Sequence, residues 1–189
     1  MTTYKAIRGL TIQTVAGDPS PLTTGDIWYS STAKKIRGAK LAAGAWASGA
    51  AMNTARDSSA GSGIGTAGLV FAGSPETVIT ESYDGSSWTE VADLNTDRAF
   101  GMGAGTQTAA LMAGGFAYPL TPSYDVALTE EYDGSSWTEV GDLNTGRRYP
   151  QSGQLGTQTS TIAFGGSPGY KDEAETWNGV GWTVKTEIN

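Results

Sequence analysis

Four tryptophans recur along this chain at nearly regular intervals, and each is followed seven positions later by an asparagine. The tryptophans stand 42, 49 and 45 residues apart, at Trp46, Trp88, Trp137 and Trp182. The asparagines are Asn53, Asn95, Asn144 and Asn189. A fixed period of this length is the signature of a repeat architecture, in which each unit packs on its neighbours. The sequence therefore predicts four units, ending near residues 53, 95, 144 and 189.

The sequence around two of the tryptophans is repeated almost letter for letter. Residues 83–91 read YDGSSWTEV, and residues 132–140 read the same. Residues 177–184, WNGVGWTV, form a weaker copy. Three units continue with Asn-Thr-x-Arg and then a stretch of small residues ending in Gly-Thr. These Gly-Thr pairs stand at residues 65–66, 105–106 and 156–157.

Each unit reads as four short strands, which predicts an all-β fold of four-stranded antiparallel units. The second strand is an apolar run such as residues 69–71, and continuous apolarity suits a strand buried on both faces. Asp-Gly or Asn-Gly then makes the turn between the third and fourth strands, because these residues tolerate positive φ. The tryptophan and the aromatic residue five positions before it are expected to pair across this hairpin.

The recurring aromatic and glycine residues are expected to hold the repeat together, because binding residues usually lie where repeats differ. These structural residues are Trp46, Trp88, Trp137, Trp182, Gly73, Gly114, Gly115, Gly165, Gly166, Tyr83, Tyr132 and Trp177.

The carboxylates of the third strands invite an acid–base interpretation, which the spacing disfavours. Glu130 and Glu131 are neighbours in a strand, so their side chains point to opposite faces. The equivalent positions of the other units are Glu81-Ser82 and Glu175-Thr176, so only the first carboxylate recurs. We therefore expect each third strand to be solvated, with one charged face. The glycine-rich residues 61–65 lack the Lys-Ser/Thr ending of a phosphate loop.

Composition excludes several classes of function. The chain has no histidine and no cysteine, which removes the commonest general base, the commonest metal ligand and every thiol. A net charge of −7 disfavours nucleic acid and anionic membranes as partners. No apolar run reaches the roughly 18 to 20 residues needed to cross a bilayer. We expect a protein that is not an enzyme, with no cofactor, no bound metal and no membrane insertion.

These residues resemble kelch repeats, in which an apolar strand ending in two glycines is followed by Tyr-Asp, then Trp, then Arg. The third unit carries Gly114-Gly115, Tyr132-Asp133, Trp137 and Arg147, and the fourth carries Gly165-Gly166, Trp177 and Trp182. The second unit has Ala72-Gly73, and the first lacks the pair. The resemblance covers roughly residues 26–189 and implies four-stranded blades of a β-propeller or propeller-like array. Kelch propellers usually have more than four blades. Either the chain closes as a small propeller, or copies of it assemble into a larger array.

A second resemblance is to virion proteins of marine tailed bacteriophages, and it spans nearly the whole chain. Those fibre-like proteins carry strings such as EYDGSSW at residues 131–137 and GTQTA at residues 105–109. They also carry a stretch like DPSPL at residues 18–22, followed by GDIWY at residues 25–29. This resemblance implies a structural protein of the phage particle, located on the virion as a tail fibre or surface protein in host attachment.

The connection between the second and third strands varies most between units, and it supplies the candidate binding residues. In the third unit it is long and carries Tyr118, Tyr124 and Asp125, and in the fourth it carries Tyr170. Rigid aromatic residues in an exposed loop suit recognition. The same residues would equally suit a stiff loop packed on its neighbour or on another subunit.

Residues 1–24 are expected to form an N-terminal arm for attachment to other virion proteins, and residues 25–189 the kelch-like domain. Homo-oligomers are expected because virion sites are symmetric, and the outward partner would be a host surface receptor or glycan. Two alternatives stay open: a decoration or tail-assembly protein without a receptor, and a cellular kelch scaffold that binds a protein partner.

Overall fold

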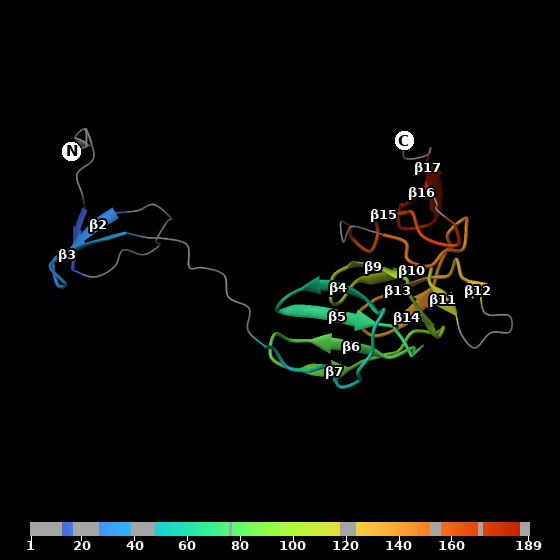
Figure 1. Ribbon diagram of the computed structural model, residues 1–189, viewed down its shortest axis with the longest axis horizontal. Coiled ribbons are helices and arrows are strands. Elements are labelled where there is room, and N and C mark those ends of the chain that lie inside the picture. Colours follow the sequence, from blue (N-terminus) through green and yellow to red (C-terminus); the bar gives the residue numbers. More distant parts are fainter. Residues whose placement is uncertain are drawn as a thin grey trace. The chain divides into compact units, whose positions relative to one another are not determined.

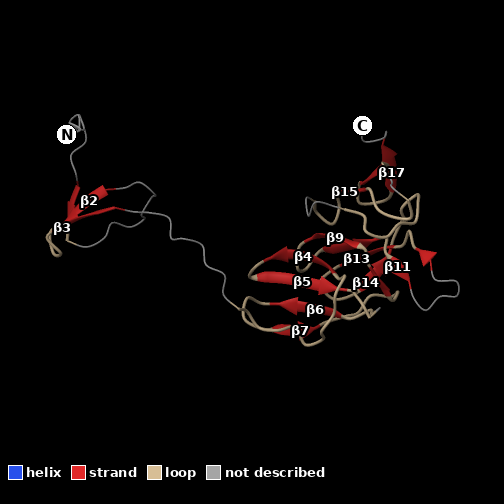
Figure 2. Cartoon of the chain, viewed as in Figure 1, coloured by secondary structure: helices blue, strands red, loops and turns tan. Residues whose placement is uncertain are grey.

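The computed structural model describes residues 13–16, 27–38, 48–75, 77–117, 124–151, 156–169 and 172–185. The chain divides into two compact units, residues 1–48 and 49–189. All regular structure in the described residues is β-strand, and no helix occurs among them (Figure 2). The all-β prediction is therefore confirmed for the part of the chain that is described.

The first compact unit holds a small mixed sheet, with strand order β1-β2-β3. Its strands are β1 (Gln13–Val15), β2 (Ile27–Ser30) and β3 (Lys35–Gly38). β1 pairs with β2 in parallel, and β2 pairs with β3 antiparallel. The sequence predicts that the first of the four antiparallel units begins near residue 26. In the structure, β2 and β3 belong to the first compact unit, and β2 has the parallel neighbour β1. Trp46 lies outside the described residues.

Three of the antiparallel sheets in the second compact unit follow the sequence repeat, and we call them the first, second and third repeat sheets (Figure 1). The first has β4 (Ala60–Ile64), β5 (Ala67–Phe71), β6 (Thr80–Tyr83) and β7 (Trp88–Glu90). The second has β9 (Met102–Gly105), β10 (Ala110–Ala113), β13 (Thr129–Tyr132) and β14 (Trp137–Glu139). The third has β15 (Thr161–Phe164), β16 (Ala174–Trp177) and β17 (Trp182–Lys185).

The predicted hairpin pairing of aromatic residues is confirmed in all three repeat sheets. Tyr83 and Trp88 are directly opposite each other, with ring centroids 4.8 Å apart. The corresponding pairs are Tyr132–Trp137 at 5.2 Å and Trp177–Trp182 at 5.4 Å. The Asp-Gly turn is confirmed as well, since Gly85 has φ +96° and the Asp84 carboxylate accepts the Ser86 and Ser87 N–H groups.

The tryptophans also join one repeat sheet to the sheet before it. Trp137 Nε1 donates to Thr80 Oγ1 at 3.1 Å, and the Trp137 ring packs edge-on against Phe71, with centroids 4.9 Å apart. Trp182 Nε1 donates to Thr129 Oγ1 at 3.0 Å in the same way. Successive sheets therefore bury their apolar faces against each other, and these interfaces form the core.

The register of the first repeat sheet differs from the alignment made on the Gly-Thr pairs. Gly63 pairs with Gly68 at the end of β4, and Gly105 pairs with Ala110 at the end of β9. Both have positive φ, +93° and +101°. Gly63 therefore corresponds to Gly105, two residues before the position that the sequence suggested. The turn after Gly105 places Gln107 where the first sheet has Gly65.

The expected solvated face of the third strands is wrong. Glu81, Glu130 and Glu175 are at most 1% exposed, and each faces a buried arginine of its own unit. The arginines are Arg56, Arg98 and Arg147. Burial raises the pKa of the Glu81 carboxyl, but the Asn53 and Thr54 N–H groups and Arg56 outweigh it and hold the pKa below its ordinary value. The Asn-Thr-x-Arg motif thus closes each unit onto its own third strand.

A small additional sheet, of order β12-β11-β8, lies beside the second repeat sheet in sequence. Its strands are β8 (Arg98–Ala99), β11 (Phe116–Ala117) and β12 (Tyr124–Asp125). It pairs the motif arginine Arg98 and its neighbour Ala99 with β11, and β11 with β12. Several residues of the candidate site lie in or beside these three strands.

Candidate functional site

One backbone arrangement recurs in all three repeat units and carries different side chains each time. The residue after the motif arginine pairs antiparallel with the first residue after the glycine that ends the second strand. The pairs are Asp57 with Ser74, Ala99 with Phe116, and Arg148 with Ser167. A constant frame with variable side chains is the arrangement that repeat proteins use for binding surfaces.

The next residue in each unit adopts a left-handed backbone conformation. Ser58, Phe100 and Tyr149 have φ of +53°, +62° and +56°. Phe100 N donates to Ser58 O at 3.0 Å, and Tyr149 N donates to Phe100 O at 2.7 Å. This conformation costs a non-glycine residue roughly 1–2 kcal/mol. The hydrogen bonds from unit to unit hold the two aromatic residues in it.

The side chains on this frame and in β12 make two sets of contacts, and we call the six residues of this region the aromatic loop cluster. The Phe100 and Tyr149 rings contact each other, with centroids 4.8 Å apart. Arg148 Cζ lies 4.8 Å from the centroid of the Phe116 ring, a cation–π contact. Arg148 Nε also lies 3.3 Å from Asp125 Oδ1. Tyr124 lies next to Asp125 in β12, opposite Ala117, and is the sixth residue that we include.

Two members of the aromatic loop cluster offer large exposed rings. Tyr124 and Tyr149 are each 51% exposed. Arg148 remains partly open, whereas Asp125 is mostly covered by its partner. The cluster can therefore contact a partner through aromatic faces, a phenol hydroxyl and a guanidinium, and it carries no group arranged for proton transfer.

The sequence identified two of these six residues. Tyr124 and Asp125 lie in β12 and belong to the cluster, while Tyr118 and Tyr170 lie outside the described residues. Phe100, Phe116, Arg148 and Tyr149 were missed. Their signal was present, because they stand one or two positions after the motif arginine or directly after the glycine pair, where the units differ.

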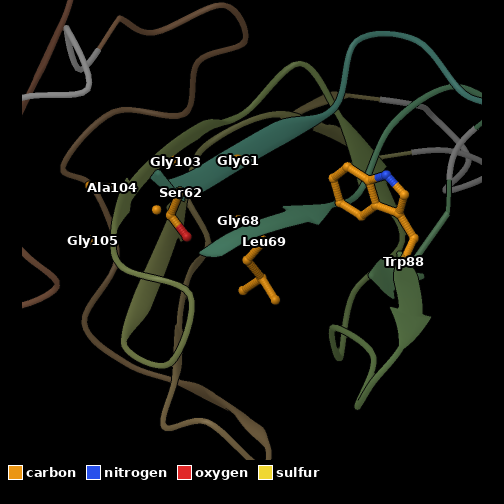
Figure 3. Close-up of a pocket in the computed structure, with 9 residues that line it drawn as sticks. Gly61, Ser62, Gly68, Leu69, Trp88, Gly103, Ala104 and Gly105 are labelled. Carbon is orange, nitrogen blue, oxygen red and sulfur yellow. The ribbon is translucent and has the colours of Figure 1, made fainter. Parts of the chain in front are cut away.

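A glycine-lined cleft of about 270 Å³ lies on the first repeat sheet and the neighbouring strand β9 (Figure 3). Its walls are Gly61, Ser62, Gly63, Gly68, Leu69, Trp88, Gly103, Ala104 and Gly105. None of these residues is ionisable, and the Ser62 hydroxyl already donates to Thr106 O at 2.9 Å. Residues 61–63 lie within strand β4 rather than in a loop before a helix. The cleft therefore lacks the features of a phosphate site or a catalytic site.

The turn aspartates are occupied by local hydrogen bonds. The N–H and hydroxyl groups of Ser135 and the N–H of Ser136 lower the pKa of the Asp133 carboxyl to about 2.

Among the described residues, no group of three or more acidic side chains is placed to hold a metal ion. Those same residues include no helix long and apolar enough to span a bilayer.

The fold defines an all-β repeat protein of stacked antiparallel sheets, and comparison with solved structures agrees. It finds 118 matching chains. One, titled "Structure of YjhT", is a kelch-type propeller with a TM-score of 0.56 and 14% sequence identity, over 85% of this chain and 51% of that chain. The chain thus spans about half the length of that structure, and the likeness concerns the fold alone. No family model and no curated protein matches the chain.

Proposed function

We propose that this chain is a kelch-like, propeller-type virion protein of a tailed bacteriophage, acting without catalysis in host recognition. The observation that carries the proposal is the aromatic loop cluster. It combines a constant backbone frame with side chains that differ from unit to unit, and two of its tyrosines are half exposed. Exposed aromatic and arginine side chains on a rigid frame are the usual anchors of recognition surfaces.

The attachment of the protein follows the same proposal. Residues 1–24 bind other virion proteins, and the protein is a homo-oligomer on the tail or surface of the particle. The aromatic loop cluster then contacts a receptor or glycan of the host surface. Support comes from the resemblance of the repeated strings to phage fibre-like proteins, and from the absence of histidine and cysteine in the whole sequence.

The test is binding of the labelled full-length protein to candidate host cells, with competition against phage adsorption. We expect saturable binding that blocks adsorption, and a loss of at least tenfold in affinity in the double variant Tyr124→Ala, Tyr149→Ala. Val180→Ala is the matched control, because Val180 is 82% exposed and lies in the Asn178-Gly179 turn of the last hairpin. Binding that survives the double variant would contradict the assignment of the cluster.

A structural decoration or tail-assembly role is the second candidate. It is favoured by the contacts within the cluster, because Arg148 lies against both Asp125 and Phe116 and so resembles a packed corner. Absence of cell binding, together with incorporation of the labelled protein into assembling particles, would favour this role.

A further inference from the structure

The two interfaces between successive repeat sheets are built in the same way, with two different faces in contact. The face of the first sheet that carries Leu69 and Phe71 packs against the face of the second that carries Tyr132 and Trp137. The other face of the second sheet then packs against Trp177 and Trp182 of the third. The stack is therefore head-to-tail, and its two ends present the two complementary halves of one interface.

Those two end faces carry large apolar side chains that are only half-buried. At the first end, Tyr83 and Trp88 take the places of Tyr132 and Trp137, yet they remain partly open, whereas Trp137 is 5% exposed. The cleft of Figure 3 adjoins this face through Gly68 and Trp88.

At the last end, Ile162 and Phe164 take the places of Leu69 and Phe71. The register supports this equivalence, because Thr161 faces Trp177 as Gly68 faces Tyr83. Ile162 and Phe164 are half-buried, whereas Leu69 and Phe71 are 3% and 0% exposed. Among the described residues of the second compact unit, each end thus resembles an internal interface that lacks the sheet on its other side.

We propose that the two end faces bind each other between two copies of the chain, so that two copies close a ring of six repeat sheets. A second copy fits because a head-to-tail interface needs one half from each end, and every copy carries both halves. The match to 51% of a solved kelch-type propeller shows that this chain has the fold of part of such a propeller. The inference is independent of the host-recognition proposal.

The interface between copies lacks two hydrogen bonds that the internal interfaces have. Gln107 Nε2 donates to Tyr83 O at 2.6 Å, and Gln158 Nε2 donates to Tyr132 O at 2.7 Å, each to the preceding sheet. The first sheet has Gly65 at this position. At the internal interfaces, Thr80 and Thr129 accept a hydrogen bond from a tryptophan of the next sheet. The third sheet has Ala174 at this position and offers no hydroxyl. The corresponding tryptophan of the first sheet, Trp88, donates its Nε1 hydrogen to Ala50 O instead. The contact between copies is therefore weaker than the internal ones and depends on concentration.

The glutamine position makes a gain-of-function test possible. A Cβ added at Gly65 meets no atom within 4 Å, and Gly65 is not among the residues with positive φ. Gly65→Gln should therefore fold unchanged and supply the missing donor to the carbonyl groups of the partner's third sheet. A ring of two copies has two such interfaces, so the substitution adds two hydrogen bonds of about 1 kcal/mol each, or roughly thirtyfold in the dissociation constant.

The experiment is sedimentation of the full 189-residue chain over a range of concentrations. We expect the 19.5 kDa species to give way to a species of twice that mass as concentration rises. Gly65→Gln should lower the dissociation constant roughly thirtyfold, and Ile162→Lys should raise it. Val184→Lys is the matched control, because Val184 is 51% exposed and lies in the same sheet. Circular dichroism establishes that each variant is folded.

Three results would overturn the inference. The first is a single-chain mass at every concentration with no response to Gly65→Gln. The second is growth beyond two copies, which would indicate an open array rather than a ring. The third is a rise in the melting temperature of Gly65→Gln without a change in mass, which would mean that another part of the same chain covers the first sheet.

Discussion

Arg147 and Glu175 form a buried ion pair in which the arginine Nη2 lies 2.7 Å from Oε1 of the glutamate, and neither side chain is exposed. The other guanidinium nitrogens of Arg147 are also satisfied. Nη1 donates to Gly165 O and Glu173 O, and Nε donates to Thr145 O. Arg98 occupies the same position in the preceding unit and pairs with Glu130 at 2.8 Å, but its Nε and Nη2 find no hydrogen-bond partner among the described residues.

This difference predicts unequal costs for the same substitution. Arg147→Met should lower the free energy of unfolding by roughly 3–5 kcal/mol, because it leaves the Glu175 carboxylate buried without its counter-ion. Arg98→Met should cost less, because it also removes two buried nitrogens that lack partners. Urea unfolding at neutral pH measures both. Equal losses in the two variants would contradict the reasoning.

Glu131 should make the protein less stable as the pH rises. Burial raises the pKa of its carboxyl above the ordinary value of 4.5, so the folded chain holds this proton more tightly than the unfolded chain does. Its favourable contribution is present below pH 4.5 and is lost as the pH rises through the folded pKa. Glu131→Gln should therefore raise the melting temperature at pH 7, and the gain should shrink towards pH 4. A gain that is the same at both pH values would refute this assignment.

Asp133 should behave in the opposite sense. Its pKa of about 2 lies below the ordinary 3.8, because Ser135 and Ser136 donate to the ionised carboxylate. The turn is therefore stabilised above pH 3.8, and this contribution is lost as the pH falls through about 2. A carbon-detected NMR titration of the aspartate carboxyl groups measures the value directly. In the Ser135→Ala variant the pKa of Asp133 should rise towards 3.8.

The close approach of β4 and β9 should make Gly103 intolerant of any side chain. A Cβ at Gly103 would lie 2.9 Å from Gly61 N and nearer still to Gly61 O, so the two strands would have to separate. We expect Gly103→Ala to lower the free energy of unfolding by roughly 1–3 kcal/mol, as overpacking does. Gly65→Ala is the control and should stay within about 0.5 kcal/mol. Thermal melting of the two variants decides the point.

Local patterns in the sequence carried the prediction of the hairpins. Pairing between Tyr132 and Trp137 and the Asp133-Gly134 turn depend on residues at most five positions apart, so their spacing alone determines them. The correspondence between units drawn from their Gly-Thr pairs was wrong for the first sheet, because Gly65-Thr66 matches the letters of Gly105-Thr106. In the structure, strand pairing aligns Gly63 with Gly105.

The sequence by itself determined the period, the strand and turn types and the absence of histidine and cysteine chemistry, since each of these is a property of short segments or of composition. Only the tertiary structure decided that Glu175 is buried against Arg147 and that the Phe100 ring contacts the Tyr149 ring. The two residues of the first pair are 28 positions apart in the sequence, and those of the second are 49 apart. From the sequence alone, a carboxylate in a strand is expected to be exposed, because nothing shows which arginine will neutralise it. Contacts between residues so far apart depend on how the chain folds back and how whole units stack.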